Sequence, residues 1–441
     1  MTMSDHPVFP SIPQGMAHGE YAMSSSCVMT VISASFDAFL ADEAADMPAA
    51  PEPMTTILMD MLSNPHARAH KDVCARGKGG EPGDSIGLAH SFRMETTDLN
   101  RYYVAFLNTR PMKEKRSPSQ LEACWKETDM SGGRKVSAMV MIMRTNGCCW
   151  VKSGGCTMCG YKEASLGGVT EEDLLSQLDQ ALSRYKDEPF VKIYTSGSFL
   201  DDNEVPPSVR ARIFEAFAGC ERILFESRPE FITEETLKDV PKTVTVALGL
   251  ESSDPEVLRT AVHKGFTPDD IKRAGTLLKS LGYGVRTYLL LKTPFMTEKA
   301  AIDDAVRSAR FADPFSDEIS VNPLNVQRGT YVERLWKRGD FRSPWIWSLM
   351  EVFRQLSGTV DSRVMSSPSG GGASRGVHNC GSCDQKALDA VERFSYSQDV
   401  KDLDVTCECQ AKWRAYMESE TLLGTPADLD RGLENDLALR M

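Results

Sequence analysis

The chain has 441 residues, of which 41% are hydrophobic and 25% are charged, a globular composition long enough for one large core with smaller attachments. It has no apolar run of about eighteen residues and no signal-peptide pattern, so we expect no membrane span and a cytoplasmic protein. The net charge of -12 disfavours a protein that grips nucleic acid by itself, and an RNA substrate would require a local basic patch or a partner.

The N-terminal part lacks the periodicity of helices or strands. Residues 1–85 are predicted to be a weakly ordered extension, because they mix Ser, Ala, Met and Pro and contain a linker at Ala49–Pro53. Either Met1 or Met54 is a possible start. Residues 86–136 are predicted to be a lead-in to the core.

Residues 137–362 alternate between apolar strands and capped helices and form the predicted core. The predicted strands cover residues 138–143, 191–195, 222–227, 243–250, 288–291 and 319–321. Thr170 and Thr267 are predicted N-caps, since acidic residues follow each of them. Six β–α units indicate an α/β fold with a parallel barrel or a doubly wound sheet. We expect a partial (β/α)6 barrel, open on one side for a large substrate.

A cysteine-rich segment ends the chain. Residues 363–377 are predicted to be a Gly/Ser linker, and residues 378–441 a small metal-binding segment. Two close pairs of thiols are sufficient for tetrahedral zinc: Cys380, Cys383, Cys407 and Cys409. His378 is a further candidate ligand or neighbour. A second iron–sulfur cluster and unpaired thiols are the alternatives.

Three cysteines follow the first predicted strand, where barrel enzymes place their chemistry. Cys148, Cys156 and Cys159 can hold three irons of a [4Fe–4S] cluster, which leaves the fourth iron open to S-adenosylmethionine (SAM). Zinc is the alternative, but it wants a fourth local ligand, and the nearest later histidine is His263. Spacing alone does not rank Cys148 against Cys149.

Polar groups end several of the later strands. The candidates for holding SAM in these turns are Ser196, Gly197, Ser198, Glu226, Arg228, Glu251 and Lys292. The structural alternatives are an ordinary tight turn for the Ser-Gly-Ser run, an ion pair of Arg228 with Glu226 or Glu251, and a solvated Lys292 in a capping loop.

Together these motifs resemble the radical SAM superfamily, in the branch of the Elongator catalytic subunit. The run Gly147-Cys148-x-Trp150 … Gly155-Cys156-Thr157-Met158-Cys159-Gly160-Tyr161 is similar to the RaSEA family of archaeosine biosynthesis. Five further runs are similar to both the Elongator branch and the RaSEA family: Thr195–Asp201, Glu226–Pro229, Leu248–Glu251, His263–Thr267 and Lys292–Phe295. The cysteine tail favours RaSEA, and the missing acetyltransferase domain speaks against Elongator.

The resemblance covers about residues 120–415 and implies roles for single residues. It makes Cys148, rather than Cys149, the first cluster ligand, because that ligand follows Gly and stands two residues before Trp. Seven residues separate Cys148 from Cys156, where the superfamily more usually has three. Met158 stands where a bulky residue commonly packs on the adenine of SAM.

The resemblance also implies a reaction and partners. A reduced cluster would cleave SAM to methionine and a 5′-deoxyadenosyl radical, which would take hydrogen from a tRNA carrying 7-cyano-7-deazaguanine with an attached lysine. Cleavage at the lysine nitrogen would leave archaeosine and make the protein a lyase. The implied partners are tRNA, an ArcS-like subunit that adds the lysine, and an electron donor such as ferredoxin or flavodoxin. The alternatives are another Elongator-like RNA modification and a non-enzymatic, metal-stapled partner subunit.

Overall fold

The computed structural model describes residues 117–161 and 165–423. The predictions for residues 1–85, for the start of the chain and for the first part of the lead-in therefore lie outside the described residues. Within the described part, no helix is both long and apolar enough to pass through a membrane.

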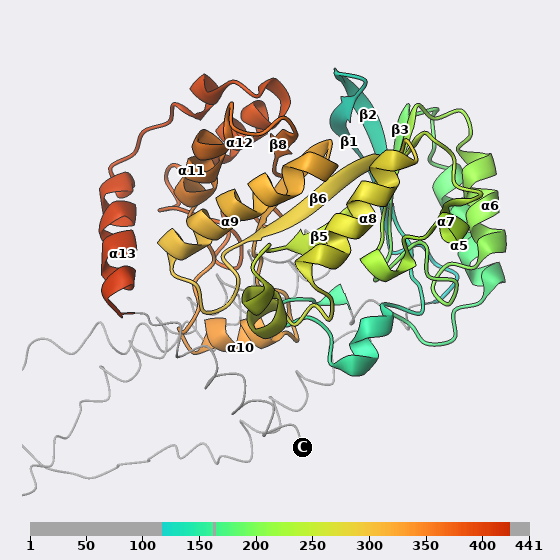
Figure 1. Ribbon diagram of the computed structural model, residues 1–441, viewed down its shortest axis with the longest axis horizontal. Helices are drawn as coiled ribbons and strands as arrows, with labels where there is room; N and C mark the ends of the chain where they lie inside the picture. The colour runs from blue at the N-terminus through green and yellow to red at the C-terminus, as the bar shows by residue number, and fades with distance from the viewer. Residues whose placement is uncertain (1–116, 162–164, 424–441) are drawn as a thin grey trace, which may run out of the picture. The chain divides into compact units, whose positions relative to one another are not determined.

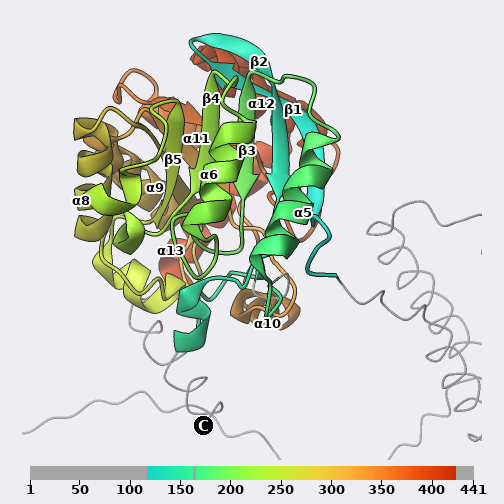
Figure 2. The ribbon, with the colours of Figure 1, turned by 90° about the vertical axis from the view of Figure 1, so that its right-hand side faces the viewer.

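One curled, eight-stranded sheet forms the framework of the described residues (Figures 1 and 2). Its strands lie in sequence order: β1 (Ala123–Ser131), β2 (Arg134–Ile142), β3 (Phe190–Tyr194), β4 (Arg222–Glu226), β5 (Val244–Glu251), β6 (Gly284–Leu291), β7 (Glu318–Pro323) and β8 (Arg363–Met365). β1 pairs antiparallel with β2, and all later neighbours are parallel. The result is a parallel half-barrel, which confirms the predicted α/β class.

Most of the helices cover the outer face of the sheet, whereas α10 lies beyond the ends of the strands, beside the loop that follows β2 (Figure 2). The helices are α5 (Glu171–Leu182), α6 (Pro207–Ala216), α7 (Glu234–Leu237), α8 (Pro268–Ser280), α9 (Glu298–Ala312), α10 (Tyr331–Lys337), α11 (Ile346–Leu356), α12 (Asp384–Ser397) and α13 (Cys409–Leu423). Thr170 and Thr267 cap α5 and α8 with full capping boxes, as predicted.

The predicted parallel strands are buried on both faces. In β2, Met139 and Met141 belong to the main core under the helices, whereas Ala138 belongs to a separate cluster with residues of neighbouring strands. Alternate residues of each strand thus face the helices or the barrel interior. This double burial explains the continuous apolar runs in the sequence.

The sequence missed both edge strands. β1 has a mostly exposed or half-buried pattern and lies in the segment predicted as a lead-in. β8 has three residues and starts the segment 363–377, which was predicted to be a linker. Neither strand carries the long apolar run that identifies a buried central strand.

The Ser/Gly-rich segment after β8 is folded against the barrel, so its prediction as a linker was wrong. The Arg375 carbonyl accepts hydrogen bonds from Val326 N and Ser343 Oγ, both at 2.8 Å. The Arg375 guanidinium donates to Glu333 at 2.6 Å. These contacts fix a stretch whose composition alone indicates flexibility.

A buried network of charges joins the two edges of the sheet at the amino ends of the parallel strands. Asp129 of β1 accepts from Lys192 at 2.5 Å, from Arg286 at 3.0 Å and from Arg363 of β8 at 3.1 Å. Glu318 of β7 pairs with Arg286 and Arg363 at 2.7 Å. Burial disfavours the ionised carboxylate, but Arg286 and Lys192 outweigh it and hold the pKa of Asp129 well below its usual range.

We expect Asp129→Asn to lower the free energy of unfolding by about 3–5 kcal/mol, because it leaves buried cations without their counter-charge. The measurement is denaturant unfolding at neutral pH. Asp239→Asn, at an exposed position, is the control and should change stability by less than about 0.5 kcal/mol. Equal stability of the two variants would show that the network does not hold the sheet edges together.

Candidate functional site

A cavity of about 510 Å³ lies inside the half-barrel and reaches the carboxyl ends of its strands. Its wall contains the three predicted cluster ligands Cys148, Cys156 and Cys159. The cavity also includes predicted SAM-holding residues from the turns after β3, β4 and β5. The structure therefore gathers most of the predicted site residues around one space.

The cysteine loop leaves β2 through tight turns. Gly147 has φ 85°, and Gly154 and Gly155, with φ of 104° and 71°, end a short 3-10 helix over Cys149–Ser153. An L side chain is strained in this left-handed region, which explains the glycines. The turns bring Cys156 back toward Cys148 across the seven-residue spacer.

His263 and its neighbours hold the loop on one side. Trp150 Nε1 donates to the His263 carbonyl at 2.8 Å, and His263 Nδ1 lies 2.7 Å from the Gly155 carbonyl oxygen. Thr157 N donates to the Val262 carbonyl at 3.0 Å. His263 thus lies beside the cysteine loop in space, where its Nδ1 braces the loop backbone.

The segment around α10 holds the other side of the loop. Gly160 N donates to Gln327 Oε1 at 2.5 Å, and Tyr331 N donates to the Thr157 carbonyl at 3.0 Å. Met158 lines the cavity, and it also packs against the apolar cluster that includes Tyr331. The loop is therefore fixed by residues more than a hundred positions further along the chain, which sequence spacing does not reveal.

Cys148 and Cys149 differ in their placement. Cys148 lines the cavity, whereas Cys149 is exposed and is not among the lining residues. A Cβ added at Gly197 would come within 2.6 Å of Cys148 Cα, so only glycine fits there. The Ser-Gly-Ser turn after β3 is thus pressed against the first predicted ligand.

The three residues of that turn face different ways. Ser196 and Gly197 line the cavity. Ser198 is buried, and its hydroxyl accepts from Arg228 N at 3.1 Å while its amide donates to Glu204 at 2.5 Å. Ser198 therefore supports the turn. It does not line the cavity, which a direct contact with SAM would require.

Two predicted carboxylates share the cavity with a lysine that the sequence analysis did not select. Glu251, with φ 64°, accepts from Lys264 Nζ at 2.6 Å. Burial opposes the charge on Lys264, but Glu251 outweighs it and raises the pKa of Lys264. Burial raises the pKa of Glu226 to about 7, although Lys264 lowers it. The lysine stands in the His263–Thr267 run, the signal that could have identified it.

Arg228 also lines the cavity, but its pairing differs from the predicted alternatives. Its Nε donates to Glu230 at 2.5 Å, and not to Glu226 or Glu251. Its guanidinium lies 5.5 Å from the Trp150 ring centroid and 4.9 Å from that of Phe266. These aromatic contacts hold the planar cation at the cavity wall.

Lys292 lies outside the cavity. Its Nζ is buried and donates to Glu298 at 2.7 Å, with Glu420 of α13 at 3.6 Å. Its predicted SAM contact and the alternative of a solvated lysine are both inconsistent with this placement. The pair instead ties the end of β6 to α9 and to the C-terminal helix.

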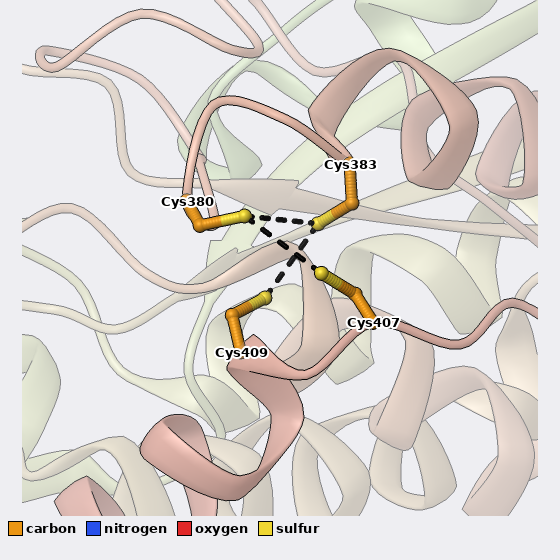
Figure 3. A group of neighbouring side chains, drawn as sticks. All are labelled: Cys380, Cys383, Cys407 and Cys409. Carbon is orange, nitrogen blue, oxygen red and sulfur yellow. Dashed lines mark hydrogen bonds between the residues drawn. The ribbon is translucent and has the colours of Figure 1, made fainter.

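The four tail cysteines converge on one point (Figure 3). Cys380 Sγ lies 3.7 Å from Cys383 Sγ and 3.8 Å from Cys407 Sγ, and Cys383 Sγ lies 3.6 Å from Cys409 Sγ. Four sulfurs around one zinc at Zn–S of about 2.3 Å would stand about 3.8 Å apart. The set therefore fits a single tetrahedral ion.

Neighbouring donors point at these sulfurs. Trp347 Nε1 lies 3.2 Å from Cys409 Sγ, and Asn379 Nδ2 lies 3.5 Å from Cys383 Sγ. Such donors stabilise thiolates around a metal. His378 is not in the four-residue set, and its Nδ1 lies 2.8 Å from the Gly376 carbonyl oxygen.

Comparisons with known proteins decide the family, although no family model matches the chain. Archaeosine synthase subunit beta of Methanosarcina acetivorans is 38% identical over 71% of this chain and 95% of that protein. Its namesake from Thermococcus kodakarensis is 34% identical over 68% of this chain and 97% of that protein. The chain belongs to the archaeosine synthase subunit beta family. The resemblance predicted from the motifs is confirmed.

A weaker similarity extends to the Elongator branch. Elongator complex protein 3 of Saccharomyces cerevisiae is 24% identical over 36% of this chain and 28% of that protein. The solved structure of Methanocaldococcus infernus Elp3 with an N-terminal deletion has a TM-score of 0.39 at 16% identity, and covers 58% of this chain and 63% of that one.

We expect Gly197→Ala to destabilise the protein by about 1–3 kcal/mol, because its Cβ would overlap Cys148 and Glu204. Thermal and denaturant unfolding measure the effect. Gly219→Ala is the matched control, since a Cβ there meets nothing within 4 Å. Unchanged stability of Gly197→Ala would contradict the close packing of the turn against the cysteine loop.

Proposed function

We propose that the chain is a radical SAM tRNA-modifying lyase, which cleaves the lysine adduct of 7-cyano-7-deazaguanine in tRNA to give archaeosine. The observation that carries this proposal is the convergence of Cys148, Cys156 and Cys159 on one cavity in a member of this family. When bound there, a reduced [4Fe–4S] cluster supplies the electron that cleaves SAM into methionine and a hydrogen-abstracting radical.

Residues around the cavity offer groups that would bind the parts of SAM. The Ser196–Gly197 turn offers backbone groups beside Cys148 for the methionine end of SAM. Glu226, Glu251 and Arg228 offer charged groups on the same wall for the amino group, the ribose hydroxyls and the carboxylate. Met158 offers an apolar surface for the adenine.

An RNA substrate requires positive charge near the cavity of this acidic chain. Residues 327–342 contain five basic and two acidic residues. Arg328, Arg334, Lys337 and Arg338 are exposed on α10 and beside it, next to the loop that carries the cluster ligands. This basic surface supports contact with tRNA phosphates. The relatives described above are named subunit beta, which supports the presence of a partner subunit. We propose an ArcS-like subunit as this partner. We propose ferredoxin or flavodoxin as the electron donor.

The decisive assay is anaerobic. The iron-reconstituted chain is incubated with dithionite, SAM and tRNA bearing the lysine-adducted base, and 5′-deoxyadenosine and the modified nucleoside are followed by mass spectrometry. We expect archaeosine and 5′-deoxyadenosine from the wild type and neither from Cys156→Ala. Cys149→Ala, which changes a thiol outside the cavity, should retain both products.

Each other outcome selects an alternative. 5′-Deoxyadenosine without archaeosine would retain the radical chemistry and assign a different RNA substrate of the Elongator-like branch. Neither product from a preparation with a reduced cluster would contradict the proposal and favour a metal-stapled partner subunit.

We further propose that the tail cysteines hold zinc rather than a second cluster. In a cubane each cysteine binds a different iron, so its thiolates stand further apart than the sulfurs seen here. We expect Cys383→Ser to lose about one equivalent of zinc and to retain iron, and Cys156→Ala to lose iron and to retain zinc. Elemental analysis of both variants measures this. Loss of iron alone from Cys383→Ser would instead assign an iron site to the tail.

A further inference from the structure

The two edges of the sheet stand beside the same cavity but are not paired along their length. β8 pairs only with Glu318–Ser320, the first half of β7, and then ends. β1 continues along β2 as far as the Ala123–Ile142 pair, at the level of the cavity. The charge network joins the edges at the other end of the barrel, at Asp129 and Arg363. Toward the cysteines, no hydrogen bond or ion pair joins β1 to β8 or to Ser366–Ser369 among the described residues.

Residues of both edges line the cavity at this gap. We call this opening the lateral slot; it is formed by Trp125, Glu127, Met365, Ser367, Pro368 and Ser369. Ser367 and Ser369 are exposed, and Trp125 is 42% exposed, so the cavity meets solvent here. β4 and β5, at whose ends Glu226, Arg228 and Glu251 lie, occupy the middle of the curled sheet, across the cavity from the slot.

Trp125 is an oriented aromatic surface in this slot. Trp125, Glu127 and Asp129 are every second residue of β1, so their side chains point to the same face of the strand. This is the inner face, because Trp125 and Glu127 line the cavity and Asp129 belongs to the buried charge network. Trp125 Nε1 donates to Glu127 Oε2 at 3.0 Å, and Glu127 Oε1 accepts from the buried Lys192 at 2.5 Å. The indole is thus held by a chain of polar contacts, while much of the side chain remains open to solvent.

We propose that the lateral slot admits the target base, turned out of the RNA, and that the base stacks on Trp125 with its reactive substituent directed toward the cysteines. This inference rests on the proposed function and assigns the substrate side of the same site. A large exposed aromatic residue at the mouth of a cavity is the usual platform for an unstacked base. Ser367 and Ser369, on the facing edge, offer hydroxyl groups for the polar rim of a purine-like ring.

The test uses the full reconstituted chain and compares Trp125→Ala with Trp125→Phe. Trp125→Ala should raise KM for the modified tRNA by about tenfold or more, as expected for a lost stacking contact, while Trp125→Phe stays within about threefold of the wild type. SAM affinity and RNA-independent cleavage of SAM should remain unchanged in both. Val400→Ala, at another exposed apolar residue, is the control and should behave as the wild type.

A second variant leaves Trp125 in place. Ser369→Trp fills the facing edge of the slot and should abolish turnover of tRNA while retaining iron content and RNA-independent SAM cleavage. Unchanged KM in Trp125→Ala together with full activity of Ser369→Trp would overturn the slot as the entrance for the base. A weakened SAM affinity in Trp125→Ala would also overturn it and place the adenine of SAM on Trp125.

These results separate the inference from the proposed function. If the wild type makes archaeosine and the slot variants do so equally well, the slot proposal is wrong and the lyase stands. If the wild type shows no RNA-stimulated formation of 5′-deoxyadenosine under the same conditions, the proposed function itself is wrong.

Discussion

The half-barrel depends on a buried set of charges that joins strands which do not share hydrogen bonds. Asp129 on β1 and Arg363 on β8 lie at opposite edges of the sheet, and their ion pair brings these edges together at one end only. Continuous pairing of backbone groups would close the barrel along its whole length and seal its interior. A pairing of side chains at the amino ends fixes the curvature there and leaves the carboxyl ends free to diverge around a cavity.

The cysteine loop shows a second use of distant contacts. Seven residues separate Cys148 from Cys156, which is more than the three that are usual in the radical SAM superfamily. A longer loop has more conformations to lose on folding. Trp150, Gly155 and Thr157 each bond to the segment before and at His263, and Gly160 bonds to Gln327. The two segments therefore restrict the backbone of the loop from both sides and fix the positions of its cysteines.

The sequence predicted the features that depend on local pattern. The central strands, the Thr170 and Thr267 caps and the grouping of the tail cysteines follow from apolar runs, capping residues and close spacing. It missed what depends on partners far along the chain. Lys292 resembles a rim cation until Glu298 is seen to bury it, Ser198 faces Arg228 rather than the cavity, and Arg375 anchors a segment whose glycines indicate a linker. The sequence of β1, which includes Trp125, has no apolar run that would predict a strand.

The late position of Arg363 in the chain has a consequence for synthesis. Asp129 and Lys192 are made early, whereas the arginine that joins β1 to the far edge follows more than two hundred residues after Asp129. The last sulfur of the tail, Cys409, which contacts Trp347 of α11, comes later still. A ribosome-bound chain therefore lacks the ion pair between Asp129 and the far edge until residue 363 has emerged. The two edges of the sheet are drawn together late in synthesis, and the exposed edge of β1 is open to pairing with another copy until then.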